Sequence, residues 1–146
     1  MKKRYGGYAS DFGGKPFVVD IEKATTTNDS FRTALWTGTH LQLTVMSIQP
    51  GDDVGLEVHP DVDQMLCLQQ GRGLAQMGKT KDDLSFLQPV FENSAVFVPA
   101  GTWHNILNTG KVPMKLYSFY APPNHPAGTV HQTKEVAEKE EGHGVH

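Results

Sequence analysis

The chain has 146 residues, of which 38% are hydrophobic and 20% charged, and its formal net charge is −3. This length predicts a single domain, and a chain of about 150 residues buries roughly 70% of its unfolded surface, which is enough to fold without disulfides. The basic residues are scattered and no 18-residue apolar run occurs, which argues against nucleic-acid binding and against a membrane-spanning helix.

The predicted elements begin after a glycine-containing segment. Four glycines within residues 1–16 give little regular structure to propagate, so we expect a flexible leader there. Residues 17–21 are an apolar run that predicts a short strand, and residues 25–30 predict a polar loop. We expect the folded domain to cover residues 17–132.

A strand is predicted at residues 40–48, with apolar side chains on both faces. This pattern is expected when one face lines a barrel and the other packs against a second sheet or subunit. Many short strands with turn residues between them follow, as is typical of an all-β sandwich or barrel. The later predicted strands are residues 65–69, 73–77, 84–91, 95–98, 103–107 and 114–120.

The strand pattern ends after residue 120. Three prolines within residues 121–126 cannot donate to a strand ladder, so this segment predicts a loop. The loop could cover the mouth of the barrel, although a plain surface loop is the simpler interpretation. Residues 133–146 predict a charged tail, in which Thr133 could cap a short exposed helix over residues 133–141.

Four side chains carry the functional prediction. Glu57 and His59 are two residues apart, which in a strand places both on one face. Gln64 follows across a turn, and His104 begins a later strand. Two imidazoles and one carboxylate are the ligand set of open non-haem iron sites, and zinc or manganese would also accept it. Taken singly, each residue is more simply explained as a solvated or core side chain.

The spacing of these residues resembles the two motifs of the cupin family, G-x5-H-x-H-x(3,4)-E-x6-G and G-x5-P-x-G-x2-H-x3-N. The first motif is matched by Gly51, Glu57, His59, Gln64 and Gly71. The second is matched by Pro99, Gly101, His104 and Asn108, with Asn93 in place of its first glycine. The variable gap also admits Asp63 as a ligand, but the final glycine then falls on Gln70, so Gln64 fits better.

The resemblance covers residues 51–71 and 93–108, and it implies a double-stranded β-helix, or jelly-roll barrel. It also implies one divalent metal ion, such as Zn, Fe, Mn or Ni, held by Glu57, His59, Gln64 and His104. Glu57 stands where the family has histidine and Gln64 where it has glutamate, so one anionic ligand is kept. The weaker amide ligand predicts modest metal affinity and a labile position, which suits either catalysis or a site that binds metal without turnover.

Small bacterial cupins of the mannose-6-phosphate isomerase-like kind are similar over the rest of the chain, including residues 31–38 and 55–60. This similarity implies a metal-dependent, isomerase-like enzyme acting on a sugar or a keto/hydroxy compound. A non-haem iron dioxygenase and a non-catalytic binding protein are the alternatives. The sequence has no recognisable phosphate clamp, since Arg72, Lys79 and Lys115 are most simply solvated surface charges.

The remaining histidines and the single cysteine carry weaker predictions. His40, His125 and His131 are most simply surface residues, and Cys67 is expected to pack on the outer face of its strand. One cysteine cannot form an internal disulfide, which is consistent with a reducing, cytoplasmic location. Cupin barrels commonly pair, so a homodimer with a small-molecule ligand is expected, without nucleic-acid or membrane partners.

Overall fold

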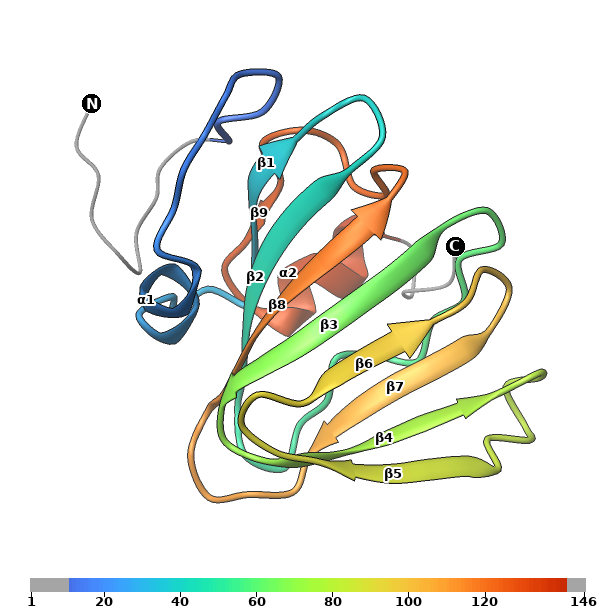
Figure 1. Ribbon diagram of the computed structural model, residues 1–146. Helices are drawn as coiled ribbons and strands as arrows, with labels where there is room; N and C mark the ends of the chain where they lie inside the picture. The colour runs from blue at the N-terminus through green and yellow to red at the C-terminus, as the bar shows by residue number, and fades with distance from the viewer. Residues whose placement is uncertain (1–10, 142–146) are drawn as a thin grey trace.

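The computed structural model describes residues 11–141, which form nine strands and two short helices (Figure 1). Residues 1–10, the larger part of the expected leader, and residues 142–146 lie outside the described residues. The elements are α1 (Ile21–Thr26), β1 (Arg32–Thr37), β2 (Gln42–Ile48), β3 (Asp63–Gln70), β4 (Gly73–Gly78), β5 (Phe86–Val90), β6 (Ala95–Val98), β7 (Trp103–Asn108), β8 (Met114–Ala121), β9 (Val130–His131) and α2 (Lys134–Glu140).

The strands form two antiparallel sheets that face each other in a jelly-roll barrel, so the predicted all-β barrel is confirmed. The larger sheet has the order β6-β3-β8-β2-β1-β9, and the smaller has the order β5-β4-β7 (Figure 1). The segment between β2 and β3 also joins the smaller sheet through single bridges from Asp53 to Leu107 and from Glu57 to His104. These bridges bring the first motif against the second.

Apolar side chains from both sheets form one core inside the barrel. Its members include Met46, Ile48, Leu66, Leu68, Ala75, Val96, Ile106, Met114 and Leu116. Fully burying one such side chain contributes roughly 1.5–3 kcal/mol, so this core is the main source of stability. Along β8, the sequence left open which side chains face inward, and the buried set is Leu116, Ser118 and Tyr120.

Turn residues of the two motifs adopt the left-handed backbone that their positions require. Gly71 and Gly101 have φ values of 92° and 81°. Asn93, which replaces the first glycine of the second motif, has φ of 75°. Asparagine tolerates this conformation better than most residues, so the departure from the motif preserves the turn.

The N-terminal part of the domain differs from the prediction, because residues 17–20 form no strand and α1 begins at Ile21 and runs into the segment expected to be a polar loop. Asp20 caps this helix by accepting a hydrogen bond from the Lys23 amide at 3.1 Å. Ala24 packs with Leu43 and Val45 on the outer face of the larger sheet. The second apolar face of β2 is therefore covered by the chain's own N-terminal segment rather than by another subunit.

The helix expected near the C-terminus is confirmed as α2, which lies behind β2 and β8 in Figure 1. The Thr133 side chain caps it by accepting from the Val136 amide at 3.2 Å. Ala137 is buried in the main core, and Lys134 forms an ion pair with Asp52 at 2.9 Å. This helix is therefore packed against the barrel rather than exposed along its length. Among the described residues, neither helix has the length and apolar character needed to cross a membrane.

Candidate metal centre

Backbone pairing places Glu57 directly opposite His104. The Glu57 amide donates to the His104 carbonyl at 3.0 Å, and the His104 amide donates to the Glu57 carbonyl at 2.9 Å. Opposed residues of an antiparallel pair project to the same face, so both side chains enter the barrel. The spacing of Glu57 and His59 was interpreted by strand geometry, and the structure has an extended segment there with single bridges.

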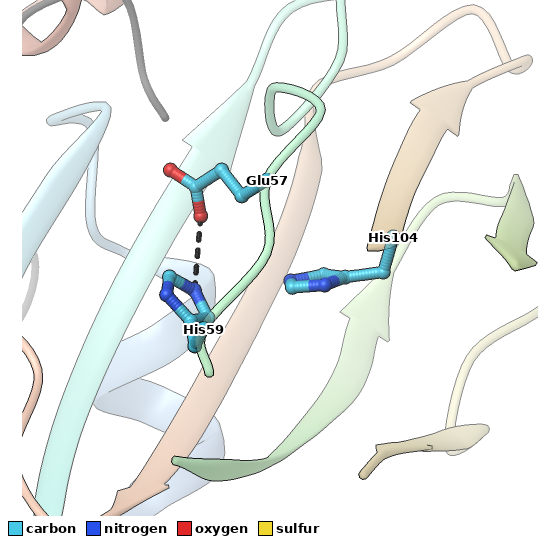
Figure 2. Close-up of side chains that lie close together, drawn as sticks. All are labelled: Glu57, His59 and His104. Carbon is cyan, nitrogen blue, oxygen red and sulfur yellow. Dashed lines mark ion pairs between the residues drawn. The ribbon is translucent and has the colours of Figure 1, made fainter. Parts of the chain in front are cut away.

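The His59 side chain meets Glu57 inside the barrel (Figure 2). Its Nε2 lies 3.2 Å from Glu57 Oε1, and its ring centroid lies 5.3 Å from that of His104. One ligand atom from each of Glu57, His59 and His104 lies within 4.8 Å of the others. All three residues are at most 3% exposed. Three of the four predicted ligands therefore converge on one buried point.

The protonation states around this point suit a cation. Burial raises the pKa of Glu57, but the hydrogen bond from His59 and the charge of Arg32 outweigh it, so this pKa lies below its usual value. Burial lowers the pKa of His104, which keeps its imidazole neutral near pH 7. A metal ligand shell requires deprotonated carboxylates and neutral imidazoles, and the two pKa shifts favour these forms at Glu57 and His104.

A carbonyl group fixes the tautomer of His104. Nδ1 of His104 lies 3.0 Å from the Thr102 carbonyl oxygen, which can only accept, so Nδ1 carries the proton. The ring of His104 extends toward Glu57 and His59, as Figure 2 shows, and its Nε2 keeps a lone pair for a ligand. Among the described residues, this buried Nε2 atom has no hydrogen-bond partner. A histidine held in this way is the usual arrangement of a metal ligand.

Gln64 occupies the inner face of β3, opposite Tyr120 on β8. Its Nε2 donates to Ser118 Oγ at 2.9 Å, which leaves Oε1 buried with no hydrogen-bond partner in the described part of the chain. The ring of Tyr120 in turn lies 6.0 Å from that of His59. Gln64 thus lies on the same side of the barrel as the cluster, and its role as a fourth ligand stays a prediction.

The residues present fit a divalent metal ion. A buried polar atom without a partner costs about 1–3 kcal/mol, and both His104 Nε2 and Gln64 Oε1 are such atoms. A cation would satisfy these two lone pairs and the charge of Glu57 together. Imidazole, carboxylate and amide donors match the preferences of zinc, iron, manganese and nickel.

The other charged and histidine residues were predicted less well. His40 is exposed, as expected, but His125 and His131 are 6% and 2% exposed, so the surface prediction for them is wrong. Lys115 is also buried, because its ammonium group contacts the Asn28 carbonyl and lies 3.1 Å from Asp29 Oδ1. Arg72 and Lys79 are exposed, in agreement with the prediction.

Sequence reasoning missed Arg32, the largest fully buried side chain of the described residues. The sequence feature that could have identified it is an arginine inside a largely apolar run, Phe31 to Trp36. No local pattern predicts which residues this arginine contacts. A cavity of about 250 Å³ has both Arg32 and Glu57 in its wall. Trp103, Lys134 and Glu141 line the same cavity. Glu57, one of the predicted ligands, therefore borders a space whose wall carries both apolar and charged side chains.

Comparison with known proteins identifies one family and several relatives that match this chain. The profile of the family described as "Cupin domain" matches residues 44–120. The protein YrkC of Bacillus subtilis (strain 168) is 63% identical over 124 residues, which is 85% of this chain and 67% of that protein. Protein L612 of Acanthamoeba polyphaga mimivirus is 37% identical over 115 residues, which is 78% of this chain and 70% of that protein. The crystal structure of BH2720 from Bacillus halodurans is 58% identical, has a TM-score of 0.88, and is matched over 89% of this chain and 98% of its own.

Proposed function

This chain belongs to the cupin family, and from that premise we propose that it is a metal-dependent enzyme acting on a small polar organic molecule. The reaction we favour is isomerase-like, a proton transfer within a sugar or a keto/hydroxy compound. Glu57, His59, Gln64 and His104 would hold the metal ion. The ion would supply a Lewis acid that polarises a substrate oxygen.

One observation carries this proposal. His104 and Gln64, two of the proposed ligands, each use one polar atom in a hydrogen bond that orients the side chain, and each keeps a second buried polar atom for the metal. The Thr102 carbonyl orients His104, and the Ser118 hydroxyl orients Gln64, while Nε2 of the first and Oε1 of the second have no partners among the described residues. Glu57 supplies the single negative charge. Purely structural residues gain nothing from this arrangement, whereas a ligand shell requires it.

The cavity beside Glu57 supports an enzyme over a passive binding protein. An aromatic side chain filling the barrel would favour the binding protein, because substrate could then not approach the metal. Phe31 and Trp103 line the cavity but leave about 250 Å³ of space next to Glu57. This volume suits a molecule the size of a small hydroxy acid or a keto compound rather than a polymer.

A non-haem iron dioxygenase is the second candidate, and one observation favours it. The converging trio of Glu57, His59 and His104 has the two-histidine, one-carboxylate composition of the facial triad that binds iron(II). In this alternative Gln64 would stay outside the ligand shell. Bound iron together with oxygen uptake would support it over the isomerase.

The proposal is tested by the metal content of protein purified without added metal or chelator. We expect about one equivalent of zinc, iron, manganese or nickel per chain in the wild type and its loss in His104→Ala. His40→Ala, which removes an exposed imidazole, is the control and should keep its metal. Absence of metal from wild-type protein, even after reconstitution, would contradict the proposal.

A further inference from the structure

Arg32 lies inside the protein with part of its hydrogen-bonding capacity unused. The side chain is 1% exposed, and its Nη1 lies 3.2 Å from Glu141 Oε2 and 3.2 Å from His131 Nδ1. Its Nε is buried with no hydrogen-bond partner in the described part of the chain. A guanidinium group can bind a carboxylate through two parallel N–H donors. Glu141 Oε2 meets this group at Nη1, so Nε remains available to a second carboxylate oxygen.

A second donor converges on the same carboxylate oxygen. His125 Nδ1 lies 3.1 Å from Glu141 Oε2, and because a carboxylate only accepts, Nδ1 donates. Nε2 of His125 lies 3.3 Å from the Tyr120 hydroxyl, which fixes the ring in this orientation. Arg32 comes from β1 and His125 from the segment after β8. Two buried donors from distant parts of the chain are therefore aimed at one anionic group.

The carboxylate that they hold belongs to the residue directly after α2. Glu141 is attached to the barrel by this short helix, whereas Arg32 and His125 belong to the barrel wall and to a loop anchored by Gln42. Glu141, Arg32 and Glu57 all line the cavity of about 250 Å³. Arg32 thus shares this cavity with one predicted metal ligand, Glu57, and Glu141 lines it from the end of α2.

We propose that Arg32 and His125 form a carboxylate-binding site beside the metal centre, and that the Glu141 side chain fills this site until a substrate carboxylate replaces it. This inference rests on the proposed function and narrows its substrate class. The substrate would be a small carboxylic acid with a hydroxyl or keto oxygen close to the carboxylate. Its carboxylate would bind Arg32 and His125, and its second oxygen would lie toward Glu57 and the metal site.

The experiment uses glycolate as a probe, because it carries one carboxylate and one hydroxyl group, and glycolamide as its uncharged analogue. Calorimetric titrations would be made on wild type, Glu141→Gln and Glu138→Gln, each loaded with zinc and each metal-free. Glu138 lines the same cavity but is exposed, so its variant changes the cavity charge without opening the site. Circular dichroism would verify that each variant is folded.

We expect Glu141→Gln to bind glycolate about tenfold more tightly than wild type, which is the gain expected if Glu141 occupies the site about nine-tenths of the time. Glu138→Gln should change the affinity by less than about twofold, and glycolamide should bind weakly to every variant. Arg32→Lys in the Glu141→Gln background should lose about tenfold, because lysine cannot bind a carboxylate through two donors. If Arg32→Lys does not fold, the difference in glycolate affinity between Glu141→Gln and Glu138→Gln still tests whether Glu141 occupies the site.

Equal glycolate affinity in Glu141→Gln and wild type, or equal gains in Glu141→Gln and Glu138→Gln, would overturn the inference. Either result would make Glu141 a purely structural ion-pair partner. Zinc content, measured on the same samples, separates this failure from failure of the proposed function. A gain in glycolate affinity without any metal binding would support the carboxylate site and contradict the metal centre.

Discussion

The orientation of Gln64 depends on one neighbouring hydroxyl group. Ser118 accepts from the Gln64 amide nitrogen, and this contact turns the amide oxygen toward the interior. We predict that Ser118→Ala weakens zinc binding about 10- to 100-fold, the usual cost of removing a group that orients a metal ligand. Competition with a chromogenic chelator would measure the affinity.

Ser47→Ala is the matched control for this prediction. Ser47 is buried, like Ser118, and lies on β2 of the same sheet, but among the described residues its hydroxyl forms no hydrogen bond with a predicted ligand. Its zinc affinity should equal that of wild type. Unchanged affinity in Ser118→Ala as well would mean that Gln64 does not bind the metal.

The ligand positions could be predicted from the sequence because their spacing is a local property. Glu57, His59 and His104 fall on motif positions, and the turns at Gly71 and Gly101 set their register. The side chains around them could not be predicted. Arg32 meets Glu141 across 109 residues, and no pattern within a short window encodes such a contact.

At the level of elements, the loop after β8 is held by Gln42. The Gln42 side chain donates to the His125 carbonyl at 2.8 Å and accepts from the amides of Asn124 and His125 at 3.0 Å. We predict that Gln42→Leu lowers the free energy of unfolding by about 2–4 kcal/mol, because two buried backbone groups of His125 and the half-buried amide of Asn124 lose their partner. Urea denaturation would measure the change.

The exposed residue Gln49 provides the control, since Gln49→Leu should change the free energy of unfolding by less than about 0.5 kcal/mol. A loss in Gln42→Leu no greater than in Gln49→Leu would show that the loop does not depend on these hydrogen bonds.

The helices show where element prediction succeeded and failed. The capping threonine before α2 was recognised, and Thr133 caps it as predicted. The apolar run at residues 17–21 was interpreted as a strand, but residues 17–20 form no regular element, and Asp20 caps α1, which begins at Ile21. A short apolar run does not by itself specify a strand, and the helix that follows this run packs Ala24 against β2.

For the whole molecule, the barrel was predictable because alternating strands and regular turns leave few other all-β arrangements. The homodimer stays a prediction, and β2 no longer supports it, since Ala24 and Ile21 cover its outer side. Four exposed aromatic and aliphatic side chains on and beside β5 and β6 offer another surface for pairing: Phe86, Leu87, Phe91 and Phe97. Light scattering should give twice the mass of one chain, and a single-chain mass at high concentration would contradict the dimer.

The central claim is that the barrel holds one metal ion between Glu57, His59, Gln64 and His104. The most direct test is a crystal structure of zinc-loaded protein with anomalous diffraction recorded on both sides of the zinc absorption edge. We predict one strong anomalous peak about 2.0–2.2 Å from His59, His104 and Glu57 ligand atoms, with the Gln64 oxygen facing it. A zinc peak only at exposed histidines such as His40, with nothing inside the barrel, would contradict the claim.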